Sequence, residues 1–205
     1  MGTETLHDPL TGVSRETLDR LEAYAACLTR WQARINLVGR GTLGSLWDRH
    51  IRDSAQLLPL FPDHAEALVD LGSGAGLPGL VLAILGVPSC HLVESDQRKA
   101  AFLREAARAA GVSDQVTVHV ARVEALDPRP AADVVMARAL APLDRLLGLA
   151  EPWLAAGAVG LFPKGRDAEA EIAAAAAHWR MDLERRPSAV DPQSTILRVT
   201  EVARV

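Results

Sequence analysis

The chain has 205 residues, a formal net charge of −4 and a hydrophobic content of 49%. This length suits one domain with a small helical extension, and the hydrophobic content excludes the disordered and fibrous classes. No apolar run approaches the roughly 18–20 residues of a transmembrane helix, and residues 1–13 are too polar for a secretory signal. We therefore expect a cytoplasmic protein. The histidines and cysteines show no metal-ligand spacing, so we expect no metal.

The first 62 residues predict a helical extension. Ser14 is a suitable cap for a helix that runs to about Trp31, with apolar side chains along one face. A second helix is predicted over residues 43–58, stopping before Pro59. The remaining residues, 63–205, form the second predicted unit, an α/β domain.

Positive charge is concentrated in residues 30–52. This stretch holds five arginines and one aspartate, a local excess of +4 in a chain whose net charge is negative. A solvated helix surface with ion pairs to acids elsewhere would explain the excess. Arginine also matches phosphate oxygens bidentately, so the same stretch is a candidate RNA-contacting surface. The candidate contacts there are Arg34, Arg49 and His50.

From residue 66, strands and helices alternate. Strands are predicted over residues 67–71, 90–94, 116–120, 133–136 and 158–162, and helices over 77–85, 97–110, 143–149 and 167–178. The tail predicts two more strands, 181–185 and 195–202, and the segment between them is too short for a crossover helix. The pattern predicts a Rossmann-like, doubly wound α/β sheet, mostly parallel with an antiparallel last strand.

The segment Ala67–Gly79 carries the strongest functional signal. An apolar strand ends in Asp70, and a glycine-dense turn leads into a helix, which is typical of a nucleotide-binding loop. The turn matches the G-x-G-x-x-G pattern of dinucleotide sites and the acid-x-Gly-x-Gly-x-Gly loop of S-adenosylmethionine (SAM) methyltransferases. Pro78 lacks a backbone donor that pyrophosphate would need, whereas an acid suits the cationic groups of SAM. SAM is therefore favoured, and the candidate loop contacts are Gly72, Ser73, Gly74 and Gly76.

Two further positions on the predicted sheet edge are candidates for the same cofactor. Glu94 ends the second strand, where a carboxylate can accept both ribose hydroxyls. The alternative, an acid that caps the next helix, is weaker because Ser95 and Asp96 are better caps. Val123 and Glu124 follow the third strand, in the loop that passes the adenine edge in SAM folds, although a plainly solvated Glu124 explains the pattern nearly as well.

The fourth strand ends next to Arg138, where methyltransferases place the group that meets the acceptor. The chain lacks the Asn/Asp-Pro-Pro-aromatic loop of amine methyltransferases and a cysteine there for covalent C5 methylation. Guanine N7 needs neither, because it has a free lone pair and no proton to lose. Arg138 would then position cofactor or guanine O6 without a general base, unless it is a structural arginine paired with an acid. Lys164 and Arg166 are candidate ligands of RNA phosphate, although a helix beginning at Asp167 would explain the same turn.

Several segments together resemble one family. In chain order they are Trp31 with Asn36–Val38, Arg49–Ser54, Asp70–Gly79, Ser95 with Arg98–Lys99 and Phe102–Leu103, Arg122–Glu124, Ala137–Ala139 and Lys164–Gly165. The Leu-Pro-Gly ending of the glycine loop and the upstream Arg-His-x-x-Asp-Ser segment are far more specific than a general SAM loop. The chain resembles the bacterial 16S rRNA guanine-N7 methyltransferases of the RsmG family, also called glucose-inhibited division protein B (GidB).

The resemblance implies a class I SAM-dependent methyltransferase fold and a guanine in the decoding-region hairpin (530 loop) of 16S rRNA as substrate. The partner would be the 30S subunit or its assembly intermediate, and we expect a monomer. The implied cofactor contacts are Gly72, Leu77, Val123, Glu124 and Arg138. Departures from the family pattern are small: Ala75 stands where proline is frequent, and Arg52 and Ala55 stand where hydrophobic residues are frequent.

Two other functions would explain part of the same sequence pattern. A non-catalytic RNA-binding protein with a relic SAM fold would have no need of the intact glycine loop and Glu94. An NAD(P)-dependent oxidoreductase would need a hydride-transfer residue, and no convincing histidine or Tyr-x-x-x-Lys pair is present. The only tyrosine, Tyr24, lies in the predicted extension. Saturable SAM binding separates the enzyme from the first alternative, and NADH binding would favour the second.

Overall fold

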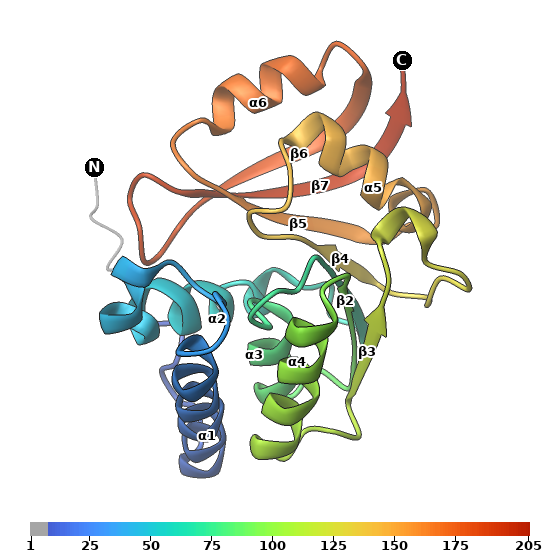
Figure 1. The fold of residues 1–205 in the computed structure, drawn as a ribbon. Coiled ribbons are helices and arrows are strands. Elements are labelled where there is room, and N and C mark those ends of the chain that lie inside the picture. Colours follow the sequence, from blue (N-terminus) through green and yellow to red (C-terminus); the bar gives the residue numbers. More distant parts are fainter. Residues whose placement is uncertain (1–7) are drawn as a thin grey trace.

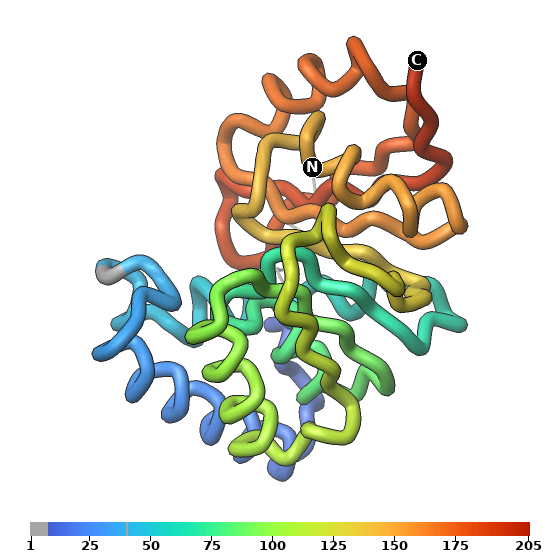
Figure 2. Tube along the Cα trace, turned by 45° about the vertical axis from the view of Figure 1, so that its right-hand side comes forward, coloured from blue at the N-terminus to red at the C-terminus, as the bar shows by residue number. Residues whose placement is uncertain are grey.

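The computed structural model describes residues 8–205, and residues 1–7 of the predicted extension lie outside the described part (Figures 1 and 2). The helices are α1 (Arg15–Gln32), α2 (Asp53–Ala55), α3 (Gly79–Ile84), α4 (Gln97–Ala109), α5 (Leu143–Ala155) and α6 (Ala168–Ala175). The strands are β1 (Ala67–Leu71), β2 (Ser89–Glu94), β3 (Val116–Val120), β4 (Val134–Met136), β5 (Val159–Lys164), β6 (Trp179–Pro187) and β7 (Thr195–Arg204).

The strands form one seven-stranded sheet in the order β3-β2-β1-β4-β5-β7-β6. Strands β1 to β5 pair in parallel, and β7 is antiparallel to both β5 and β6. The predicted, mostly parallel sheet with an antiparallel last strand is therefore confirmed. Strands β1 and β3 have the predicted bounds, whereas β6 is longer than predicted at both ends.

Alternating side chains of the central strands build a core on each face of the sheet. Leu68 of β1 packs in the cluster formed with α1, α3 and α4, whereas Val69 and Leu71 pack in the cluster formed with α5. Figure 1 shows the two groups of helices on opposite sides of the sheet, with α1 beside α4. Because both faces are covered, the ends of the strands are the surfaces left for ligands.

The extension shares its core with the α/β domain. Ser14 caps α1 as predicted, with its Oγ accepting a hydrogen bond from the Thr17 N–H at 3.1 Å. The buried face of α1 packs in the same cluster as α3 and α4, and Trp31 meets Phe102 of α4 edge-on at 5.9 Å between ring centroids. The N-terminal segment is thus held rigidly against the glycine-loop side of the sheet.

The predicted regular helix over residues 43–58 is wrong in its geometry. The chain forms a 3₁₀ segment (Arg40–Ser45), a π-helical segment (Trp47–Arg52), the short α2 and a second 3₁₀ turn (Leu58–Leu60) that contains Pro59. Carbonyl oxygens of the π-helical segment accept side-chain hydrogen bonds. Arg138 Nη1 donates to the Arg49 carbonyl oxygen at 3.4 Å, and Ser54 Oγ donates to the His50 carbonyl oxygen at 2.7 Å. Such π-helical turns are frequent at functional sites.

Candidate functional site

A cleft of about 360 Å³ lies beyond the carboxyl ends of β1, β2 and β3, bounded on its far side by the segment after β4. We call it the cofactor cleft. The predicted cofactor residues that line it are Gly72, Gly74, Glu94, Val123 and Glu124. Three predicted contacts, Ser73, Gly76 and Leu77, lie in the same loop but do not line the cleft. The position agrees with the general rule for open α/β sheets, in which ligands bind beyond the strand ends.

Glu94 holds the glycine loop and the start of α4 together. Its Oε2 accepts from the Gly74 N–H at 2.9 Å, and its Oε1 accepts from the Asp96 N–H at 2.8 Å. Asp96, as the sequence suggested, is the actual cap of α4. Glu94 is only 7% exposed, and it lines the cleft. A fixed carboxylate of this kind suits a ribose diol.

Asp70 does not line the cofactor cleft. This acid was expected from the sequence to suit the cationic groups of SAM, but its side chain contacts the protein instead. Its side chain is fully buried, and its Oδ2 accepts from the Gly79 N–H at 3.1 Å. A Cβ on Gly79 would lie 2.5 Å from Leu92 Cδ2 and 2.8 Å from that same oxygen, so only glycine permits this contact. Burial raises the pKa of Asp70 to about 6. The acid therefore fixes the start of α3.

Tyr24 supports the glycine loop, a contact that was not predicted from the sequence. It lies fully buried in α1, and its hydroxyl donates to the Ala75 carbonyl oxygen in the glycine loop at 2.7 Å. Burial strongly raises the pKa of this phenol, which keeps it a donor. The extension thus supports the cofactor loop directly. A tyrosine on the apolar face of a predicted helix is a sequence signal for a buried hydroxyl, which needs a hydrogen-bond partner.

A second cleft, of about 810 Å³, lies between the π-helical segment and the loop before β7. We call it the acceptor cleft. Of the predicted RNA contacts it brings together Arg49, His50 and Arg166, and Arg138 lines it as well. Arg34 is exposed and lines a separate hollow near the end of α1. Arg138 does not line the cofactor cleft, and its predicted cofactor contact stays a prediction.

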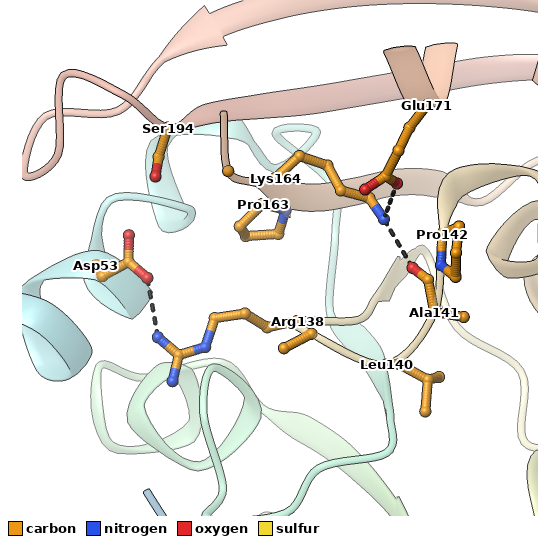
Figure 3. A pocket seen from close by; sticks show the side chains of 11 residues that line it. Asp53, Arg138, Leu140, Ala141, Pro142, Pro163, Lys164, Glu171 and Ser194 are labelled. Atoms are coloured by element: carbon orange, nitrogen blue, oxygen red, sulfur yellow. Dashed lines mark hydrogen bonds and ion pairs between the residues drawn. The ribbon is translucent and has the colours of Figure 1, made fainter. Parts of the chain in front are cut away.

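The Arg138 guanidinium is held by the extension. Its Nη1 forms a 2.9 Å ion pair with Asp53 Oδ2, and its Nη2 lies 3.0 Å from His50 Nδ1 (Figure 3 shows the ion pair). Burial, followed by the charges of Arg138 and Arg49, lowers the pKa of His50 to about 4. A neutral ring accepts from Arg138 through Nδ1, while Nε2 is 2.8 Å from Thr42 Oγ1. Asp53 was not singled out from the sequence, although it lies in the Arg-His-x-x-Asp-Ser segment.

Lys164 lines a cavity of about 420 Å³ next to the acceptor cleft. Its Nζ donates to the Ala141 carbonyl oxygen at 2.8 Å and pairs with Glu171 Oε2 at 2.8 Å (Figure 3). Its side chain is only 9% exposed, whereas Arg166 is exposed. The turn after β5 therefore presents the arginine to solvent and keeps the lysine inside.

Residues 8–205 contain neither a potential metal site nor a helix that could cross a membrane. No three His, Cys, Asp or Glu side chains gather there as a potential metal site. None of the helices described for these residues has the length and apolar character needed to cross a bilayer.

Solved methyltransferase structures share this architecture. An O-methyltransferase from Bacillus cereus in complex with SAH matches with a TM-score of 0.57 at 12% identity, covering 94% of this chain and 93% of that one. TYW2 from M. jannaschii in complex with AdoMet matches with a TM-score of 0.56 at 14% identity, covering 84% and 80%. The sheet order and these likenesses define the fold of the class I SAM-dependent methyltransferases.

The chain belongs to the GidB family, described as rRNA small subunit methyltransferase G, whose pattern matches residues 17–195. It is 57% identical to the ribosomal RNA small subunit methyltransferase G of Paramagnetospirillum magneticum, over 100% of this chain and 98% of the relative. The protein of the same name from Rhodospirillum centenum is also 57% identical, over 94% and 88%. The resemblance seen in the sequence segments is confirmed.

Proposed function

We propose that the protein transfers the methyl group of SAM to N7 of a guanine in 16S rRNA, in the decoding-region hairpin (530 loop). The carrying observation is that the cofactor cleft and the acceptor cleft meet at one short segment. Ala139 lines both clefts, with Arg138 on the acceptor side and Leu140 on the cofactor side. Family membership and the names of the relatives support rRNA as the substrate class.

The residues of the cofactor cleft fit SAM. Glu94 is a buried carboxylate, held by two backbone N–H groups, that would accept from the ribose hydroxyls. Val123 and Glu124 line the same cleft and would contact the adenine edge. Gly72 has φ +70°, a backbone conformation that residues with a side chain rarely adopt, so glycine is favoured at this position of the loop. SAM supplies an electrophilic methyl group when bound. The chain's own residues orient the donor beside the acceptor cleft.

The acceptor cleft suits a nucleobase that needs no deprotonation. Guanine N7 attacks through its lone pair, so positioning and desolvation are the main requirements. Arg138, held at 2.9 Å by Asp53, lines this cleft, and its guanidinium is the proposed donor to an oxygen such as guanine O6. Arg49 and Arg166 line the same cleft and are exposed, as phosphate contacts must be. Arg34 would extend this basic surface along the extension.

We further propose that the substrate is presented by the 30S subunit or its assembly intermediate, and that a monomeric enzyme acts on it in the cytoplasm. The two relatives from Paramagnetospirillum magneticum and Rhodospirillum centenum are named as methyltransferases of small-subunit ribosomal RNA, which supports the first statement.

Calorimetry with SAM, followed by methyl transfer to 16S rRNA, tests the proposal. We expect saturable SAM binding and incorporation of label from methyl-labelled SAM into rRNA or 30S particles. Binding without transfer to any rRNA substrate would favour the relic RNA-binding protein. Binding of NADH in place of SAM would favour the oxidoreductase.

A further inference from the structure

We propose that Lys164 and Glu171 form a clamp that positions the wall between the two clefts and thereby sets the alignment for methyl transfer. The wall is residues 138–142, which form most of the segment between β4 and α5. The inference rests on the proposed function, because it assigns a positioning role within that same site.

Three contacts form the clamp. Lys164 Nζ donates to the Ala141 carbonyl oxygen at 2.8 Å, and the same ammonium pairs with Glu171 Oε2 at 2.8 Å. Glu171 Oε2 also accepts from the Leu143 N–H at 2.8 Å. The end of β5, the middle of α6 and both sides of Pro142 are thus joined through two side chains, as Figure 3 shows for Lys164, Glu171 and Ala141.

The wall depends on outside support. Pro142 precedes α5 and offers no side-chain cap, so the first N–H of α5 obtains its partner from Glu171 of another helix. Ala139 has φ +55°, an unfavourable conformation for a residue with a Cβ, which must be imposed by its surroundings. The ion pair of Arg138 with Asp53 holds one end of the wall, and the clamp holds the other.

Movement of this wall would alter both clefts. Ala139, Leu140 and Ala141 line the cofactor cleft, and Leu140 is the side chain that faces Gly72. Arg138 and Ala139 line the acceptor cleft. The clamp therefore acts on donor and acceptor alignment through the wall, and Lys164 and Glu171 are positioning residues.

The same geometry separates this role from phosphate binding. Lys164 is 9% exposed and already has an anionic partner within 2.8 Å, so an RNA phosphate would have to displace Glu171. Arg166, two residues further on, is exposed and lines the acceptor cleft. Removal of the Glu171 charge decides between the roles: it would strengthen phosphate binding by a free lysine, but weaken a clamp.

The test compares Lys164→Met, Glu171→Gln and the double variant in full-length protein, with SAM affinity from calorimetry and kcat and KM from methyl transfer to 16S rRNA. The matched control is Glu169→Gln, on the same helix, whose partner Arg185 is on the surface. We expect each single variant to raise the Kd for SAM and lower kcat by about tenfold, with KM for RNA within about twofold. Because the two residues act as one unit, the double variant should be no worse than the more severe single variant.

Several outcomes would overturn the clamp. One is a Glu171→Gln variant with wild-type SAM affinity and kcat, whatever Lys164→Met does. Another is a Lys164→Met variant that raises KM for RNA with a shallower salt dependence while Glu171→Gln lowers that KM, since this is the signature of a phosphate contact. Absence of SAM binding by the wild-type protein would refute the proposed function instead. The near-isosteric Glu171→Gln variant decides the question if Lys164→Met does not fold.

Discussion

Substitution of Tyr24 by phenylalanine tests how far the extension supports the cofactor loop. The change removes a single oxygen, which donates to the Ala75 carbonyl at 2.7 Å. Both residues are buried, with Tyr24 at 0% and Ala75 at 5% exposure, so water does not readily replace the lost donor. An unsatisfied buried acceptor costs about 1–3 kcal/mol. We expect Tyr24→Phe to lower the free energy of unfolding by that amount and the Tm by about 2–4 °C per kcal/mol.

The substitution should also weaken SAM binding, because Ala75 follows Gly74, which lines the cofactor cleft. We expect the Kd for SAM to rise by about threefold to tenfold, measured by calorimetry. Urea unfolding gives the stability, with an unchanged m-value showing that the two states expose the same surface. The matched control is Thr29→Val in the same helix, where the lost hydrogen bond goes to the Ala25 carbonyl oxygen of that helix and not to the glycine loop. Wild-type stability and SAM affinity in Tyr24→Phe would refute the reasoning.

Three further predictions follow from the site. Asp53→Asn weakens the hold on Arg138 and should lower kcat for RNA methylation by about tenfold while SAM affinity stays within twofold; an equal loss of SAM affinity would contradict the assignment of Arg138 to the acceptor side. Charge reversal at both Arg34 and Arg49 should weaken transfer to RNA and leave SAM binding intact in calorimetry, and a variant defective in SAM binding would count against the basic surface. Burial raises the pKa of Asp70 from 3.8 to about 6, so the folded protein keeps a proton that the unfolded chain has released, and stability should fall as pH rises across this range. Relative to Asp70→Asn, the wild type should lose up to about 3 kcal/mol in urea titrations between pH 4 and 7, and a constant difference would contradict a raised pKa.

The sheet and the cofactor edge were predictable because their signals are local. Strand alternation, the glycine turn and the acid that ends β2 lie within short windows, and the sheet topology follows from the alternation of strand and helix. The same holds for the Asp96 cap of α4, which bonds to N–H groups two and three residues away.

The supporting contacts were not predictable, because their partners are distant in sequence. Tyr24 and Ala75 are 51 residues apart, and Arg138 and Asp53 are 85 residues apart. The sequence predicted a basic turn with Lys164 and Arg166. The ion pair of Lys164 with Glu171 follows only from the position of α6 in the fold. The irregular turns of residues 40–60 also escaped prediction, because an apolar helical period does not distinguish α from π or 3₁₀ geometry.

The central claim is most directly tested by mapping N7-methylguanine in 16S rRNA after deletion of the gene. Borohydride reduction and aniline cleave the RNA chain at N7-methylguanine, so each methylated site gives a defined fragment. We predict that the cleavage in the 530 loop is lost in the deletion strain and restored by the wild-type gene. A variant with Gly72→Val should not restore it, because φ is +70° at this position and a β-branched residue is strained there. An unchanged cleavage pattern in the deletion strain would contradict the assigned reaction.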